Sequence, residues 1–235
     1  MSLAAAERAS LPGRDPASRS RLEVLAREVR PAVAAADRTL PVAGDLGALL
    51  PGGGLRRGSV VTVGGAVGDG GTSLVLHLAA AATAAGEWAA LVDPRSTLGG
   101  AAAAEAGVSL DRCAFVRRVP QGRWATVVAA LLDGVALVVA TVPTGLRPGD
   151  ARRLAARARE RAAVLVALEA PPTAGAPGRA GAWPVEAALR MVAEGSPWPG
   201  LTAGSGLLAP RALRVGVERR DGARSGEVAP LARAG

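Results

Sequence analysis

A glycine-rich segment at residues 65–72 reads Gly-Ala-Val-Gly-Asp-Gly-Gly-Thr and stands between a β-branched apolar run and an Ala/Leu-rich run. Its spacing matches the phosphate-binding loop pattern G-x-x-x-x-G-K-[ST] at Gly65, Gly70 and Thr72. In such a loop backbone N–H groups surround the phosphate oxygens, while a lysine reaches the β and γ phosphates. Gly71 occupies the lysine position, and the chain contains no lysine. The segment is therefore predicted to be a phosphate loop that has lost its cation, or else a glycine-rich turn without any ligand.

The carboxylates that a nucleotide hydrolase needs are also missing. An aspartate that holds magnesium is expected at the end of the apolar run 135–142, but Ala140 and Thr141 stand there. Asp93 is the one candidate general base, and neighbouring Arg95 would lower its pKa. Each missing group contributes on the order of several kcal/mol to transition-state stabilisation. We therefore expect no catalytic residues, no functional cofactor and negligible ATPase activity.

Two sets of residues are candidate contact surfaces. Arg153, Arg157 and Arg161 recur at helical spacing and form a row that could meet DNA phosphates or an acidic partner. The alternative is a solvated helix face, which charged runs commonly are. Trp183 and Trp198 are flanked by prolines and are candidate binding residues, since tryptophan is frequent at interface hot spots. A core position in an edge hairpin is the alternative for both.

Composition sets limits on the class of protein. The chain has 235 residues, of which 49% are hydrophobic and 20% charged, and this is enough to bury a core. The net charge of +8 is carried entirely by arginine and makes nucleic acid or acidic protein a plausible partner. Single copies of cysteine (Cys113) and histidine (His77) exclude a disulfide framework and a Cys/His-rich metal site. The apolar stretch 124–142 is interrupted at Asp133, so we expect no membrane span, and we expect a cytoplasmic location.

Strand-like and helix-like runs alternate along the chain, which predicts an α/β fold with a doubly wound, mostly parallel sheet flanked by helices. The predicted strands are 59–63, 88–92, 113–116, 135–142 and 164–168, and the predicted helices are 72–85, 101–106, 124–132 and 150–161. Two edge strands are predicted near the C-terminus, at 185–192 and 207–217. Residues 1–39 are predicted as an arm with one amphipathic helix, 40–220 as the core domain, and 221–235 as a polar tail.

The order of these pieces resembles the RecA/RadA recombinase core over residues 40–217. The resemblance lies in LPGGGLRRGSVV before the glycine loop and in ALVDPRSTLGG after it. It implies a RecA-like fold in which Arg95 replaces the catalytic glutamate, and Ala140 or Thr141 replaces the magnesium aspartate. The recombinase loops that contact DNA would fall at 144–148 and 170–182, where no clear basic or aromatic set is present.

Within that superfamily the chain is similar to the RecA-like accessory proteins of inducible mutagenesis, the ImuA group, and most of all to its actinobacterial ImuA-prime branch. The segments that carry this are LLPGGGLRRGSVV, WATVVAALLDG and RPGDARRLAARARERAAVLV. The resemblance implies an inert adaptor in translesion synthesis during the SOS response to DNA damage. The implied partners are an inactive Y-family polymerase homologue (ImuB-like) and an error-prone C-family polymerase, with RecA as a further candidate and direct DNA contact left open.

Two other functions stay open. One is a cell-division inhibitor similar to SulA, which is also a degenerate RecA-like protein. The other is a weak ATP-binding protein or ATPase with a non-standard loop, using Thr72 and Asp93.

Overall fold

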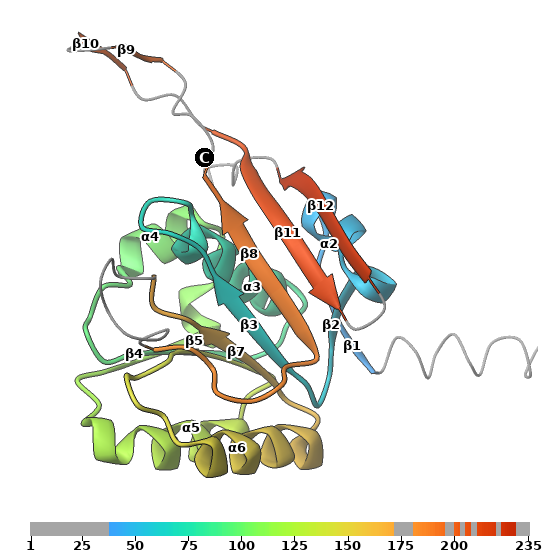
Figure 1. Ribbon diagram of the computed structural model, residues 1–235, viewed down its shortest axis with the longest axis vertical. Coiled ribbons are helices and arrows are strands. Elements are labelled where there is room, and N and C mark those ends of the chain that lie inside the picture. The colour runs from blue at the N-terminus through green and yellow to red at the C-terminus, as the bar shows by residue number, and fades with distance from the viewer. Residues whose placement is uncertain are drawn as a thin grey trace, which may run out of the picture. The chain divides into compact units, whose positions relative to one another are not determined.

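An eight-stranded mixed sheet forms the centre of the protein in a computed structural model that describes residues 38–171, 181–195, 200–202, 205–207, 211–219 and 222–228 (Figure 1). Its strands are β3 (Val60–Gly64), β4 (Ala89–Asp93), β5 (Cys113–Arg117), β6 (Leu137–Thr141), β7 (Val164–Leu168), β8 (Leu189–Glu194), β11 (Leu213–Arg219) and β12 (Gly222–Val228). They are arranged in the order β12-β11-β8-β3-β7-β6-β4-β5. The six strands from β8 to β5 are parallel, and β11 is antiparallel to both β8 and β12.

Helices cover both faces of the parallel part of this sheet. They are α3 (Gly71–Ala84), α4 (Gly100–Glu105), α5 (Trp124–Leu132) and α6 (Pro148–Arg161). Side chains alternate along each strand, so Val139 packs in the core with α3 and α4, whereas Val138 packs in the core with α5 and α6. Both faces of the sheet are therefore buried under helices, which explains why strands such as VLVAL are apolar throughout. The predicted α/β class, the mostly parallel sheet with flanking helices, and the antiparallel strands near the C-terminus are confirmed.

Smaller elements complete the described residues. The two-stranded ribbon of β1 (Thr39–Pro41) and β2 (Gly54–Arg56) encloses α2 (Gly44–Leu49) and a 3₁₀ turn at Pro51–Gly53. The helix α2 packs against β12, the edge strand of the large sheet. Leu49 of α2 lies so close to Gly226 that a Cβ built on this glycine would be 2.7 Å from Leu49 Cδ2. Further 3₁₀ turns lie at Leu110–Arg112 and Gln121–Arg123, and β9 (Leu201–Thr202) pairs with β10 (Ser205–Gly206).

The C-terminal strands differ from the prediction. The expected strands 185–192 and 207–217 are observed later, as β8 and β11, and the expected polar tail contains β12, which pairs with β11 from Leu213↔Val228 to Arg219↔Gly222. β12 was missed because Val228 is its only buried side chain, so its sequence lacks the alternation that marks a half-buried strand. The amphipathic helix predicted within 22–33 and Trp198 lie outside the described residues.

No helix in the described ranges has both the length and the apolar character that crossing a bilayer requires.

Candidate functional site

The glycine loop joins β3 to α3, as the sequence predicts, and two of its glycines are required by close contacts. Gly65 has a φ of 151°, and a Cβ there would lie 2.7 Å from the Ala193 carbonyl oxygen on β8. Gly70, the residue before α3, has a φ of 102°, and a Cβ there would lie 2.3 Å from Leu213 Cδ1 on β11. The loop is thus packed tightly against the neighbouring strands, and this part of its glycine pattern is explained by packing without any ligand.

A cavity of about 1270 Å³ opens beside this loop. It lies at the carboxyl ends of β3, β6 and β7, next to the position where the chain crosses from β7 to β8 on the other side of β3. Such crossing points in parallel sheets are the usual place for ligands, although this cavity is larger than the roughly 300–1,000 Å³ of a small-molecule site. Its described lining combines the loop with residues from several elements, among them Thr72, Ser73, His77, Arg95, Trp124, Thr141, Glu169, Arg211 and Leu213.

The side chain of Asp69, within the loop, accepts a hydrogen bond from one of the loop's backbone amides. The Ala66 N–H donates to Asp69 Oδ2 at 2.8 Å, and the Asp69 N–H donates back to the Ala66 carbonyl at 3.2 Å. The Arg211 guanidinium donates to the Gly68 carbonyl of the same loop. In a phosphate loop the amides are available to an incoming anion. Here a carboxylate already accepts from one of them, although Asp69 itself is not among the residues that line the cavity and its Oδ1 lies toward Gly195.

The cationic side chains of the cavity do not replace the missing lysine. Gly71 begins α3 and contributes only backbone there. Arg95 lies in the exposed turn after β4 and, among the described residues, makes no ion pair or hydrogen bond. The Thr72 side chain is exposed at the cavity, so its hydroxyl is accessible. The loop therefore offers a helix N-terminus and a hydroxyl but no lysine, while Arg211 contacts the loop through the Gly68 carbonyl.

Asp93, the candidate general base, has a structural role instead. It is 1% exposed and is not part of the cavity lining. Its carboxylate accepts from the Leu98 N–H at 2.6 Å and from Thr97 Oγ1 at 3.2 Å, so it holds the turn that leads to α4. At the end of β6, Thr141 lines the cavity, whereas Ala140 is buried toward α5 and α6. Within the described residues no group of three or more potential metal ligands gathers anywhere.

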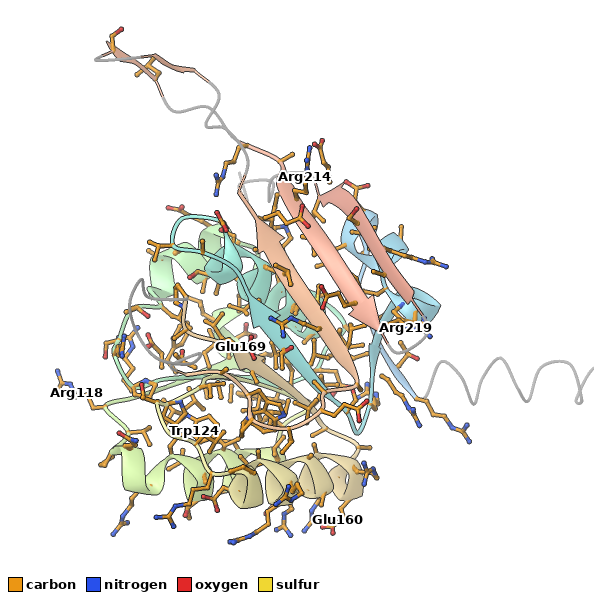
Figure 2. The ribbon with its side chains drawn as sticks, viewed as in Figure 1. Arg118, Trp124, Glu160, Glu169, Arg214 and Arg219 are labelled. Atoms are coloured by element: carbon orange, nitrogen blue, oxygen red, sulfur yellow. The ribbon has the colours of Figure 1, made fainter. Side chains whose placement is uncertain are left out.

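Glu169, which sequence reasoning missed, follows the last residue of β7 and lines the cavity (Figure 2). It is 8% exposed, and its Oε1 accepts from the Trp183 N–H at 3.0 Å. Its Oε2 lies 3.7 Å from an Arg190 nitrogen on β8. The carboxylate therefore ties the chain around residue 183 to the sheet. The signal is an acid directly after the apolar run VLVAL, at the end of a strand other than the two from which the metal ligand and the base are expected.

The tryptophans are distributed differently from the prediction. Trp183, a candidate binding residue, is 6% exposed and packs in the core with α5 and α6, so it is not available to a partner. Trp124 at the start of α5 is also buried. The exposed tryptophan in the described part of the chain is Trp88, before β4, which is 50% exposed and was not singled out from the sequence.

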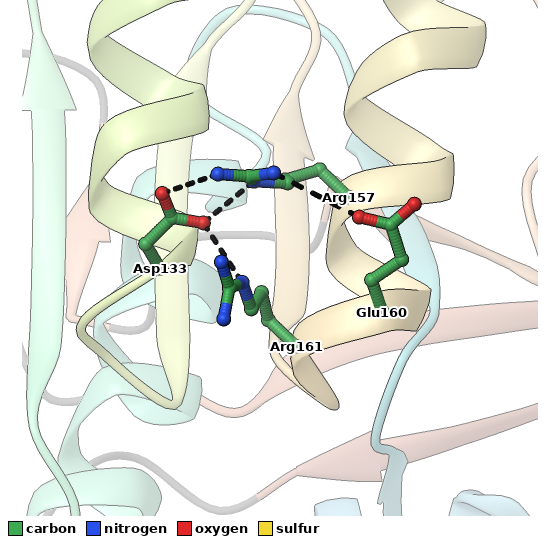
Figure 3. Close-up of polar contacts among 4 residues, drawn as sticks. All are labelled: Asp133, Arg157, Glu160 and Arg161. Carbon is green, nitrogen blue, oxygen red and sulfur yellow. Dashed lines mark hydrogen bonds and ion pairs between the residues drawn. The ribbon is translucent and has the colours of Figure 1, made fainter.

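The predicted arginine row is divided by an ion-pair cluster (Figure 3). Arg157 donates to both oxygens of Asp133 at 2.6 Å, and Arg161 donates to Asp133 Oδ1 at 3.1 Å. The hydrogen bond from Arg157, with the charges of both arginines, lowers the pKa of Asp133 below its usual value. Arg153 is separate, with a side chain 82% exposed and 3.7 Å from Asp150. Two members of the row therefore join α6 to the end of α5, and the row as a binding surface stays a prediction.

Fold and site together define an α/β protein with helices on both faces of a mostly parallel mixed sheet, and with a glycine-loop cavity at the strands' carboxyl ends that has no phosphate-binding lysine. Residues 48–173 match the family model described as the MT3502 N-terminal domain. That match covers more than half of the chain, so the protein belongs to this family. It extends from α2 through β7 and includes the glycine loop, α5 and α6. No curated protein matches the chain.

Proposed function

We propose that this protein is a catalytically inert, cytoplasmic adaptor with a RecA-like fold that acts through protein contacts in translesion synthesis after DNA damage. The glycine loop is the observation that carries the proposal. Gly71 stands at the cation position, and the Asp69 carboxylate accepts from the Ala66 amide. The loop thus keeps its place between β3 and α3 while lacking the charges that bind a triphosphate.

Electrostatics favours this proposal over hydrolysis. A nucleoside triphosphate brings several negative charges, which ATP-binding loops offset with a lysine and a metal held by a strand-end acid. Here the corresponding strand end presents Thr141, and the carboxylate that does line the cavity, Glu169, is engaged with the Trp183 amide and Arg190. Asp69 adds a further negative charge within the loop. Each difference disfavours a bound Mg²⁺–triphosphate.

The proposed partners are an inactive Y-family polymerase homologue (ImuB-like) and an error-prone C-family polymerase, with RecA as a third. The support is the resemblance of three sequence segments to the ImuA group. The test is tagged co-expression of the full chain with each candidate, followed by purification in high salt to remove charge-driven association. Co-purification with the Y-family homologue at a fixed stoichiometry is the expected result. Capture of the tubulin-like division protein instead would favour the SulA-like alternative.

Weak nucleotide binding is the second candidate, favoured by the open cavity and the exposed Thr72 hydroxyl at the start of α3. It predicts ATP turnover or an ATP-dependent rise in melting temperature that the Thr72→Ala substitution abolishes. Ser73→Ala is the matched control, because Ser73 is also exposed and lines the same cavity. ATP turnover that is lost in Thr72→Ala and kept in Ser73→Ala would overturn the adaptor proposal in favour of an enzyme.

A further inference from the structure

The positive charge of the described protein is concentrated on the layer formed by α5 and α6. The segment from residue 123 to 134 together with that from 147 to 162 contains seven arginines and three acidic residues. The rest of the described residues contain twelve arginines and eleven acidic residues, which nearly balance. Figure 2 shows nitrogen-tipped side chains along the side of these helices that faces away from the sheet. This layer therefore presents a cationic face on an otherwise near-neutral surface.

Five of the seven arginines of this layer fall into two groups with different roles, and the other two, Arg123 and Arg147, are the exposed N-cap residues of α5 and α6. Arg157 and Arg161 both pair with Asp133, and Arg157 also lies 3.8 Å from Glu160, so two acids offset these two arginines. Arg152 and Arg159 are exposed and have no ion pair or hydrogen bond within the described residues, and Arg153 has only its 3.7 Å contact with Asp150. The Asp133 cluster fixes α6 against α5, so the three outward arginines project from a rigid support. We call Arg152, Arg153 and Arg159 the open arginines.

The chemistry of this face indicates the class of partner. Exposed large apolar side chains in the described part are Val67, Trp88, Leu110 and Leu207, and none of them is on α5 or α6. Between its arginines the face presents small residues such as Thr126, Ala130 and Ala156. Protein interfaces draw most of their binding energy from buried aromatic and apolar anchors. A nucleic-acid backbone needs no such anchors, because its contacts are with charged phosphates.

From this arrangement we infer that the α5–α6 face binds the phosphate backbone of duplex DNA without sequence preference. Arg152 and Arg159 are seven residues apart, which corresponds to about 10 Å along the helix, so the open arginines can reach successive phosphates. Guanidinium groups contact phosphate oxygens bidentately. The small side chains allow the backbone to approach closely, and the lack of exposed aromatic residues on these helices disfavours stacking on single-stranded bases. This inference goes beyond the adaptor proposal and does not depend on a polymerase partner.

The test is DNA binding by the full chain, measured by fluorescence anisotropy on two labelled duplexes of unrelated sequence. Three phosphate contacts give a slope of about −2.7 in log affinity against log salt, or about a 40-fold loss of affinity between 50 and 200 mM salt. The variant Arg152→Ala/Arg153→Ala/Arg159→Ala should make the slope shallower by about 2.7 on both duplexes. Alanine is the best helix former, so α6 should be retained in this variant, and circular dichroism verifies this.

The matched control is Arg38→Ala/Arg56→Ala/Arg224→Ala, which removes the same charge from exposed positions near β1, on β2 and on β12. The inference expects this control to keep the wild-type slope. Equal losses in both variants would overturn it, because net charge alone would then explain binding. It would also be overturned if the wild-type chain bound no duplex, or if polyglutamate of equal charge competed as well as DNA. Loss of DNA binding leaves the polymerase co-purification untouched, so the two proposals fail separately.

Discussion

Replacing Gly71 with lysine returns the missing cation to the first residue of α3. The site accepts the side chain, because a Cβ built there would meet Leu168 Cδ1 at 3.8 Å and the Gly64 carbonyl oxygen at 4.0 Å, which are ordinary contacts. Asp69→Asn is combined with it. This removes the negative charge of the loop, while the amide oxygen can still accept from the Ala66 N–H.

The size of the effect follows from Coulomb's law. A lysine about 4 Å from one phosphate charge gains about 1 kcal/mol in water and about 4 kcal/mol at the effective dielectric constant near a protein surface. Each 1.4 kcal/mol is about tenfold in affinity, so the double variant should gain measurable ATP binding. At a nucleotide concentration about 100 times Kd, the folded state is stabilised by about 2.7 kcal/mol. For a chain of this size, this raises Tm by roughly 5–10 °C.

The assay is thermal unfolding of wild type, Gly71→Lys/Asp69→Asn and Gly71→Gln/Asp69→Asn, with and without ATP and Mg²⁺. The glutamine variant has a similar length without the charge and is the control. We expect a shift for the lysine variant only, and no hydrolysis, because Thr141 still stands at the metal position. A shift of equal size in the glutamine variant, or no shift in the lysine variant, would refute the argument that charge is what the loop lacks.

Four further predictions concern the glycine loop, the buried cysteine and the Asp133 ion pairs. Gly65→Ala should destabilise the protein by about 1–3 kcal/mol, measured by urea unfolding, because a positive φ is combined there with a 2.7 Å approach to a carbonyl oxygen. The control is Gly68→Ala, whose Cβ would meet no atom within 4 Å and which should therefore cost less. Burial raises the pKa of Cys113 to about 11 from 9.0, so its thiol should react about 100-fold more slowly with a disulfide reagent near pH 8 than an ordinary thiol. The folded state favours the neutral thiol, so the free energy of unfolding should also fall as pH rises from 9 to 11. The pKa of Asp133 is lowered in the folded state, so its ion pairs stabilise the protein fully above its ordinary pKa of 3.8. This stabilisation is lost as pH falls through the lower pKa of the folded state. Asp133→Asn should remove this acid dependence, which is measured as the free energy of unfolding at each pH.

The central strands and helices could be predicted because their burial is complete. The run VLVAL is buried on both faces, and its predicted limits, 164–168, are those of β7. The predicted helix 124–132 coincides with α5, whose buried Trp124, Val128 and Leu132 repeat at helical spacing. β12 could not be predicted in the same way, because its place is determined by pairing with β11 across the hairpin and not by its own side chains.

Site residues were harder to predict than elements because their roles depend on tertiary partners. The arginine row has the correct helical spacing, but Asp133, more than twenty residues earlier, pairs with two of its members. Asp93 stands at the end of a strand, where a general base is expected, but its carboxylate accepts a hydrogen bond from the Leu98 N–H of the following turn. Trp183 has the local sequence of an exposed loop and is nevertheless buried against the helices of one face. The absence of lysine from the glycine loop needed no structure, because it is a property of the sequence alone.

The most direct test of the central claim is isothermal titration of the unmodified full chain with ATP and Mg²⁺, starting from nucleotide-free protein. A loop without its lysine, whose Ala66 amide already donates to Asp69, predicts no saturable heat up to millimolar nucleotide. Saturable binding of one ATP per chain with a micromolar Kd would contradict the account.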